Sequence, residues 1–160
     1  MAKEKETKTN AMRILEKEKL PYTAVTYECT EFIDGITIAD KLGLPYERVY
    51  KTLVTVGKSK EHYVFVIPIS EELDLKKAAK AVGEKSIEMI HVKELTPLTG
   101  YIRGGCTAIG MKKQFKTVVA EQAAGLQELY VSGGKWGVQL KLTPENYMKA
   151  CRGSYADICV

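Results

Sequence analysis

Two runs of apolar and β-branched residues, 49–56 and 62–69, are separated by a short polar segment that begins with Gly57. Side chains alternate between the two faces of a β-strand. In both runs the two alternating sets are largely apolar, so neither face suits solvent. The two runs therefore predict an antiparallel hairpin that other elements of the chain must bury.

Lys51 interrupts the first of these runs. In the alternation it shares a face with Val49 and Leu53. A lysine on an apolar strand face costs free energy unless its ammonium group reaches a partner or a pocket. The pattern therefore makes Lys51 a candidate functional residue. A second hypothesis, that Lys51 blocks aggregation at an exposed sheet edge, fits the pattern equally well.

The rest of the chain alternates short strands with short helices and contains no repeat or linker. Asp74 and Thr143 are suited to cap helices, and Gly43 and Gly83 are suited to end them. Strands are predicted at 22–27, 86–89, 115–120, 128–132 and 138–142 besides the hairpin, and helices near 10–20, 36–42, 74–82, 121–124 and 143–151, with a helical turn at 92–95 before Pro97. This order predicts a mixed α/β fold, in which helices surround a mixed, partly closed, β-barrel-like sheet.

The length of 160 residues suits one domain. Residues 1–10 are charged and without periodicity, so we expect a flexible tail followed by a single domain over 11–160. No apolar run is long enough for a membrane span or a signal segment, which favours the cytoplasm. The four cysteines form no CxxC pair and there are two histidines, so we expect free thiols, no metal and no cofactor.

Residues 99–113 read TGYIRGGCTAIGMKK and hold four of the 13 glycines. Glycine lets the backbone approach a ligand closely, and peptide N–H groups beside cations suit an anion or a developing oxyanion. Taken alone, the composition favours an ordinary loop with glycine-enabled turns. Cys106 is the thiol beside the glycine pair, but His62 and His91 lie in no recognisable motif, so a Cys–His nucleophilic pair is the weaker hypothesis.

This stretch resembles the glycine-rich core of the YbaK-type aminoacyl-tRNA deacylases, small editing domains related to the insertion domain of bacterial prolyl-tRNA synthetase. The resemblance extends over about residues 11–158. Further matching segments follow in the same order: VYKTL at 49–53, ELDLKKAAKAVG at 72–83, VSGGKWG at 131–137 and YADI at 155–158. The resemblance implies a barrel-like mixed α/β domain with a central pocket.

The resemblance also implies where substrate binds. Lys51 would orient the tRNA end, and the amides of Gly104 and Gly105 would face the ester carbonyl, so these three residues are the catalytic candidates. The residues that the resemblance assigns to substrate binding are Tyr27, Tyr101, Cys106, Ser132, Gly133, Gly134, Lys135 and Asp157.

The activity implied by the resemblance is hydrolysis of mischarged tRNA. The segments GGCTAIGMKK and VSGGKWG are closer to the cysteine-editing group, which favours Cys-tRNA(Pro) as substrate. The motifs offer no obvious Ser-His-Asp set. The resemblance implies substrate-assisted chemistry, in which the thiol of the cysteinyl group attacks its own ester while the protein supplies positioning and electrostatic stabilisation. Aminoacyl-tRNA is the expected partner, and prolyl-tRNA synthetase is a further candidate.

Three other hypotheses stay open. The protein could remove alanine from Ala-tRNA(Pro) by attack of water, it could be a non-catalytic tRNA- or synthetase-binding module, or it could bind a small anion unrelated to tRNA. The net charge of +4 is compatible with tRNA but does not require it. Trp136 replaces an expected arginine, and Thr107-Ala108 replaces an expected serine-proline pair; both departures bear on substrate preference rather than on the fold.

Overall fold

The predicted hairpin lies at the centre of the larger of two sheets in the computed structural model, which describes residues 8–160. Strands β2 (Tyr50–Gly57) and β3 (His62–Pro68) pair antiparallel, as predicted. Strand β4 (Ile87–Met89) flanks β2, and β5 (Lys116–Ala120) flanks β3. Strand β8 (Gly153–Ala156) completes the order β4-β2-β3-β5-β8, with β3, β5 and β8 parallel to one another. The hairpin is therefore enclosed within a mixed sheet.

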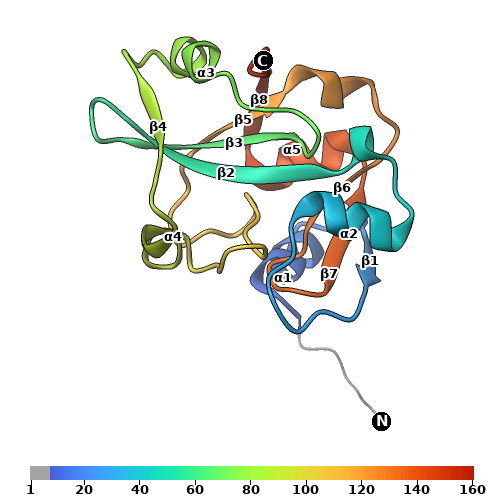
Figure 1. Cartoon of the computed structure of the whole chain (residues 1–160). Coiled ribbons are helices and arrows are strands. Elements are labelled where there is room, and N and C mark those ends of the chain that lie inside the picture. Colours follow the sequence, from blue (N-terminus) through green and yellow to red (C-terminus); the bar gives the residue numbers. More distant parts are fainter. Residues whose placement is uncertain (1–7) are drawn as a thin grey trace.

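A smaller antiparallel sheet lies against one end of the larger one (Figure 1). Its order is β1 (Thr23–Thr26), β7 (Val138–Leu142) and β6 (Leu129–Ser132). The two sheets meet at a parallel bridge between Val49 and Tyr130, which continues β2 toward β6. We call this junction the seam. The predicted mixed α/β class is confirmed, with the strands divided between two sheets that join there.

Helices pack around both sheets (Figure 1). They are α1 (Asn10–Lys17), α2 (Gly35–Leu42), α3 (Leu75–Val82), α4 (Val92–Thr99) and α5 (Pro144–Cys151), with short 3-10 turns η1 (Tyr46–Arg48) and η2 (Glu121–Gly125). Gly43 and Gly83 end α2 and α3 with φ angles of +70° and +76°, as the sequence predicts. Within residues 8–160 none of these helices has the length and apolar character needed to cross a membrane.

Most of the predicted tail, residues 1–10, lies outside the described residues. Thr9 is the N-cap of α1, and its hydroxyl oxygen accepts a hydrogen bond from the Met12 N–H at 3.2 Å. Asn10 is the first residue of the helix. Helix α1 therefore begins one residue before the boundary that we expect at residue 11.

Helix α4 continues past Pro97 to Thr99, although the sequence predicts a turn that ends before the proline. Proline lacks the N–H that a helix interior needs. Other bonds hold the last turn: the Thr99 hydroxyl donates to the Leu95 carbonyl at 2.8 Å, and the Gly100 N–H donates to the Thr96 carbonyl at 2.8 Å. These bonds close the helix beyond the proline.

Strand β8 was not predicted, because residues 153–156 read GSYA and include no β-branched residue. The strand forms by parallel pairing with β5, which places Tyr155 opposite Val119. Just beyond it, Ile158 is fully buried and its carbonyl accepts the Asp74 N–H at 2.8 Å. Its pairing partner, rather than local propensity, determines this strand.

Candidate active site

A cavity of about 290 Å³ opens at the seam, and we call it the seam pocket. Its walls come from β2, the segment that leads into α2, the first glycine-rich loop, and the facing ends of β6 and β7. The lining residues that matter for its chemistry are Lys51, Thr52, Gly104, Cys106, Ser132 and Gln139. The structure therefore brings the Lys51 strand and the glycine-rich loop to one cavity, although more than fifty residues separate them in the chain.

Strand β2 carries the half-buried Lys51 into the lining of the seam pocket. Among residues 8–160 its ammonium group forms no hydrogen bond or ion pair. The acid in the lining, Asp34, caps α2 instead, because its carboxylate accepts the Thr37 N–H at 2.8 Å. Hydrogen bonds from the Thr37 side chain and from its N–H, with a smaller contribution from the charge of Lys51, lower the pKa of Asp34. Lys51 therefore keeps its positive charge available for an anionic oxygen of a ligand.

The glycine pair is required for close contact between two loops. Gly104 has a φ of +86°, and a Cβ there would lie 2.8 Å from the Phe32 ring and 3.0 Å from the Trp136 indole nitrogen. A Cβ on Gly105 would lie 2.9 Å from the Lys135 Cα. Both positions therefore exclude larger residues.

The structure engages the Gly105 amide elsewhere, and its predicted role toward the ester stays a prediction. Its N–H donates to the Ile102 carbonyl within the same loop, at 2.9 Å, and Gly105 is absent from the pocket lining. Gly104 does reach the lining. The Gly105 N–H is occupied by this hydrogen bond within the turn. Gly104 is the residue of the pair that lines the pocket.

Three flat side chains gather where the first glycine-rich loop meets the segment before α2. The guanidinium carbon of Arg103 lies 4.2 Å from the centre of the Phe32 ring. The Trp136 indole N–H donates to the Arg103 carbonyl at 2.8 Å. An exposed cation–π pair contributes about 0.5–1 kcal/mol. Trp136 therefore fastens the second glycine turn to the first loop through its indole N–H.

Cys106 lines the seam pocket and is buried. Burial raises the pKa of its thiol to about 12, although a hydrogen bond with the Thr99 side chain opposes the shift. The thiolate rather than the thiol is the nucleophile, so Cys106 is unreactive near neutral pH. Neither histidine lines the pocket, and the His62 ring packs against Phe115 with 5.8 Å between centroids. The structure does not form the Cys–His pair.

The second glycine turn, residues 132–135, packs against the first glycine-rich loop and β7 beside the seam pocket. Ser132 reaches the lining, and its hydroxyl oxygen accepts the Gly134 N–H at 3.3 Å. Gly133 lies so close to β7 that a side chain there would collide with it. Gly134 has a φ of +104°. Of the four residues predicted to bind substrate in this turn, Ser132 alone lines the pocket, and Gly133, Gly134 and Lys135 shape its support.

Two predicted substrate-binding tyrosines lie outside the lining. Tyr27 follows β1, and its N–H donates to the Gly137 carbonyl at 2.9 Å. Tyr101 is buried, and its hydroxyl donates to the Ile109 carbonyl at 2.6 Å. Tyr101 therefore supports the glycine-rich loop from inside, and its predicted contact with substrate stays a prediction.

Asp157 is absent from the lining of the seam pocket, and its predicted contact with substrate stays a prediction. Its carboxylate forms an ion pair with Lys77 of α3 at 3.1 Å. The same ammonium group donates to the Cys159 carbonyl at 2.9 Å. The near-terminal aspartate thus helps to attach the end of the chain to α3.

Gln139 is a pocket residue that the motifs do not point to. It is 4% exposed, and its Oε1 has no hydrogen-bond partner among the described residues. The hydroxyl oxygens of Tyr50 and Thr52 are also buried and unpartnered, but these side chains lie on the face of β2 opposite to Lys51, beside Cys159 and Tyr147. An unpartnered buried acceptor costs about 1–3 kcal/mol, which a ligand that donates a hydrogen bond to Gln139 would recover. The signal in the sequence is the alternation of VQLKL, which sets Gln139 on the opposite face from Val138 and Leu140.

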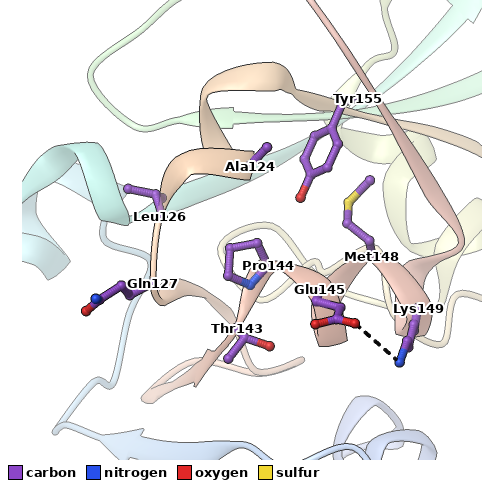
Figure 2. A pocket seen from close by; sticks show the side chains of 9 residues that line it. All are labelled: Ala124, Leu126, Gln127, Thr143, Pro144, Glu145, Met148, Lys149 and Tyr155. Carbon is purple, nitrogen blue, oxygen red and sulfur yellow. Dashed lines mark ion pairs between the residues drawn. The ribbon is translucent and has the colours of Figure 1, made fainter.

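A second cavity, of about 600 Å³, lies between η2 and α5, and we call it the α5 groove (Figure 2). Figure 2 shows Pro144, Met148 and Tyr155 around it. Lys149 at its rim forms an ion pair with Glu145, one helical turn earlier, at 3.8 Å. The groove contains none of the predicted site residues.

Residues 36–150 match the family model of the aminoacyl-tRNA editing domain, and the chain belongs to this family. A curated relative, EbsC of Enterococcus faecalis, is 48% identical over 160 residues, which cover 99% of this chain and 98% of the relative. That relative bears the provisional name Cys-tRNA(Pro)/Cys-tRNA(Cys) deacylase. The resemblance to the YbaK-type deacylases is thereby confirmed.

Two solved structures share the fold. One, described as a candidate trans-editing enzyme for prolyl tRNA synthetase, has a TM-score of 0.81 at 23% identity and covers 97% of this chain and 99% of its own. The other, the hypothetical protein APE2540, has a TM-score of 0.86 at 20% identity and covers 94% of this chain and 99% of its own. At these identities the likeness establishes the architecture.

Proposed function

We propose that this protein removes cysteine from mischarged tRNA, Cys-tRNA(Pro) in particular, by a reaction in which the thiol of the substrate is the nucleophile. The observation that carries the proposal is the pairing of an uncompensated Lys51 cation with a Cys106 thiol whose pKa burial raises to about 12. A pocket that holds a cation but no activated nucleophile suits a substrate that brings its own. The name of the E. faecalis relative supports the same substrate class.

In this reaction the sulfur of the cysteinyl group attacks the carbonyl carbon of its own ester. A carbon–sulfur bond forms, the bond between that carbon and the ribose oxygen breaks, and the thiol proton ends on the released tRNA hydroxyl. Water then hydrolyses the cyclic thioester to cysteine. The protein is not modified at any step, so it contributes positioning and stabilisation of the developing charge.

Three residues of the lining have a part in this proposal. Lys51 holds a phosphate or ribose oxygen at the 3′ end of the tRNA. Gly104 places the backbone against the ester carbonyl. Gln139 accepts a hydrogen bond from the ammonium group of the substrate, which gives its buried Oε1 a partner. Seryl and alanyl esters lack the thiol and are spared.

The test is deacylation of purified Cys-tRNA(Pro), Ala-tRNA(Pro) and Ser-tRNA(Pro), side by side, by the wild-type protein. We expect rapid loss of cysteine with the other two esters left intact. Equal loss of alanine would replace the substrate thiol with water as nucleophile. Loss of none of the three would leave the binding-module hypothesis in first place.

We further propose that the protein acts in the cytoplasm and that prolyl-tRNA synthetase contributes tRNA selection. A protein with a similar fold is described as a candidate trans-editing enzyme for that synthetase, which supports the proposal. Deacylation of Cys-tRNA(Pro) and Cys-tRNA(Cys) is measured with and without the synthetase. Selective acceleration of Cys-tRNA(Pro) is expected, and identical rates for both tRNAs in both mixtures would remove the synthetase from the proposal.

A further inference from the structure

The mouth of the seam pocket carries a stacked pair of side chains, Phe32 and Arg103. Both belong to the pocket lining, and both are exposed, Phe32 by 37%. The guanidinium carbon lies 4.2 Å from the ring centre. Phe32 thus covers one side of the guanidinium group. The opposite side of this exposed group can contact a ligand.

The backbone under this pair is fixed in place. Trp136 belongs to the segment of the second glycine turn, and its indole N–H donates to the Arg103 carbonyl at 2.8 Å. The next residue, Gly104, has no Cβ, and a Cβ there would strike both Phe32 and Trp136. The loop therefore leaves room for the ring and the indole to approach it, and the guanidinium is held at the mouth of the pocket.

The position of this cation matters because of a departure from the family pattern. The resemblance leads one to expect an arginine where this chain has Trp136. In the structure Trp136 holds the first loop, and the cation at the pocket mouth is Arg103 on that loop. Positive charge is therefore present at the mouth, but as a flat group stacked on an aromatic ring.

We propose that Arg103 is a substrate-binding residue that stacks on the terminal adenine of the aminoacyl-tRNA, so that Phe32, Arg103 and the base form three layers. The inference rests on the proposed function. If the cavity of about 290 Å³ takes the aminoacyl ester and its ribose, the base lies outside, at the mouth. Unpaired bases stack on guanidinium planes in proteins that bind nucleic acids. Such stacking does not require hydrogen bonds that read the base.

Trp136 supplies a direct probe, because it is the one tryptophan of the chain and contacts Arg103. Its fluorescence is followed while the wild-type protein is titrated with AMP and, separately, with ribose 5-phosphate. We expect AMP to bind and ribose 5-phosphate to bind at least tenfold more weakly, because it lacks the base. Failure of AMP to bind at millimolar concentration would overturn the inference.

Two variants of Arg103 distinguish the contribution of its planar guanidinium group from that of its positive charge. Arg103→Lys keeps the charge and loses the plane, and Arg103→Met loses both. We expect each to weaken AMP binding about tenfold, whereas Lys58→Met, an equal change of charge on the exposed β2–β3 turn, leaves it unchanged. Wild-type affinity in Arg103→Lys, with loss of both ligands in Arg103→Met, would assign Arg103 to a phosphate and overturn base stacking. Thermal unfolding checks that each variant is folded.

The same variants are then assayed on Cys-tRNA(Pro). We expect kcat/KM to fall about tenfold in Arg103→Lys and Arg103→Met, through KM. AMP binding that depends on the Arg103 plane, in a wild-type protein that deacylates nothing, would preserve this inference and refute the proposed function. Deacylation that is indifferent to both substitutions would refute the inference and preserve the function.

Discussion

The α5 groove has about twice the volume of the seam pocket, about 600 against 290 Å³, and yet it offers less chemistry. The lysine of the groove is paired with Glu145, whereas Lys51 in the pocket has no counter-ion within hydrogen-bonding range among residues 8–160. The lining of the pocket also includes Gln139, whose Oε1 is buried and has no hydrogen-bond partner among the described residues. An unpaired charge and unsatisfied polar atoms, rather than volume, distinguish a reaction site from an ordinary surface groove.

The two cavities contain matched residues, so each can serve as a control for the other. The largest effect is expected from Lys51→Ala, with Lys149→Ala in the groove as its counterpart. Removal of one stabilising charge at a reacting centre lowers kcat by about 10²–10³. We expect deacylation of Cys-tRNA(Pro) to fall by that factor in Lys51→Ala and to stay within twofold in Lys149→Ala. Rates within twofold of wild type in both variants would end the distinction between the cavities.

Gly104→Ala is expected to have the next largest effect, with Gly125→Ala in η2 beside the groove as its counterpart. Gly104 has a φ of +86°, and its added Cβ would strike Phe32, whereas a Cβ on Gly125 meets nothing within 4 Å. Urea unfolding should show a loss of about 1–3 kcal/mol for Gly104→Ala and a change within about 0.5 kcal/mol for Gly125→Ala. We also expect about a tenfold loss of deacylation for Gly104→Ala alone, and equal stability in the two variants would contradict the close contact.

Gln139→Leu tests whether the unpartnered acceptor serves the substrate, and Gln127→Leu at the groove is its counterpart. Leucine removes a buried polar atom, so stability should hold or rise by about 1 kcal/mol. We expect kcat/KM on Cys-tRNA(Pro) to fall about tenfold, because the substrate ammonium group loses an acceptor. The result against this role would be loss of stability without loss of activity. Gln127→Leu should change neither quantity.

Cys106 is expected to give the smallest effect, although it lies in the pocket itself. Cys106→Ala should stay within about threefold of wild type in deacylation, because a thiol with a pKa near 12 is no nucleophile at neutral pH. Burial raises this pKa from 9.0, so the unfolded chain releases the proton first and stability falls as pH rises from about 9 toward 12. Urea unfolding at pH 8 and pH 10 should show a shallower decline in Cys106→Ala. An inactive Cys106→Ala that is fully folded would point to a covalent mechanism.

Most elements of the fold could be predicted from local pattern, β8 and the end of α4 excepted, and the site only in part. Period-two alternation singled out Lys51, and capping residues such as Asp74 fixed helix bounds. The stacking of Arg103 on Phe32 could not be predicted, since about seventy residues separate them and no periodicity connects them. The hydrogen bond of the Gly105 N–H and the ion pair of Asp157 could not be predicted, because a motif identifies a residue but not the direction of its N–H or the partner of its carboxylate.

The seam has a consequence for how this protein loses activity on heating or storage. The pocket takes Lys51 from one sheet and Gln139 from the other, while in backbone terms the sheets join at the bridge between Val49 and Tyr130. Partial opening along this line would dismantle the pocket while each sheet kept its own ladder of hydrogen bonds. On heating, enzymatic capacity should therefore disappear some degrees before circular dichroism records any melting. Storage lifetime would then be set by the hinge between two intact halves, and a bond engineered across that hinge would prolong it more than any repacking of the core.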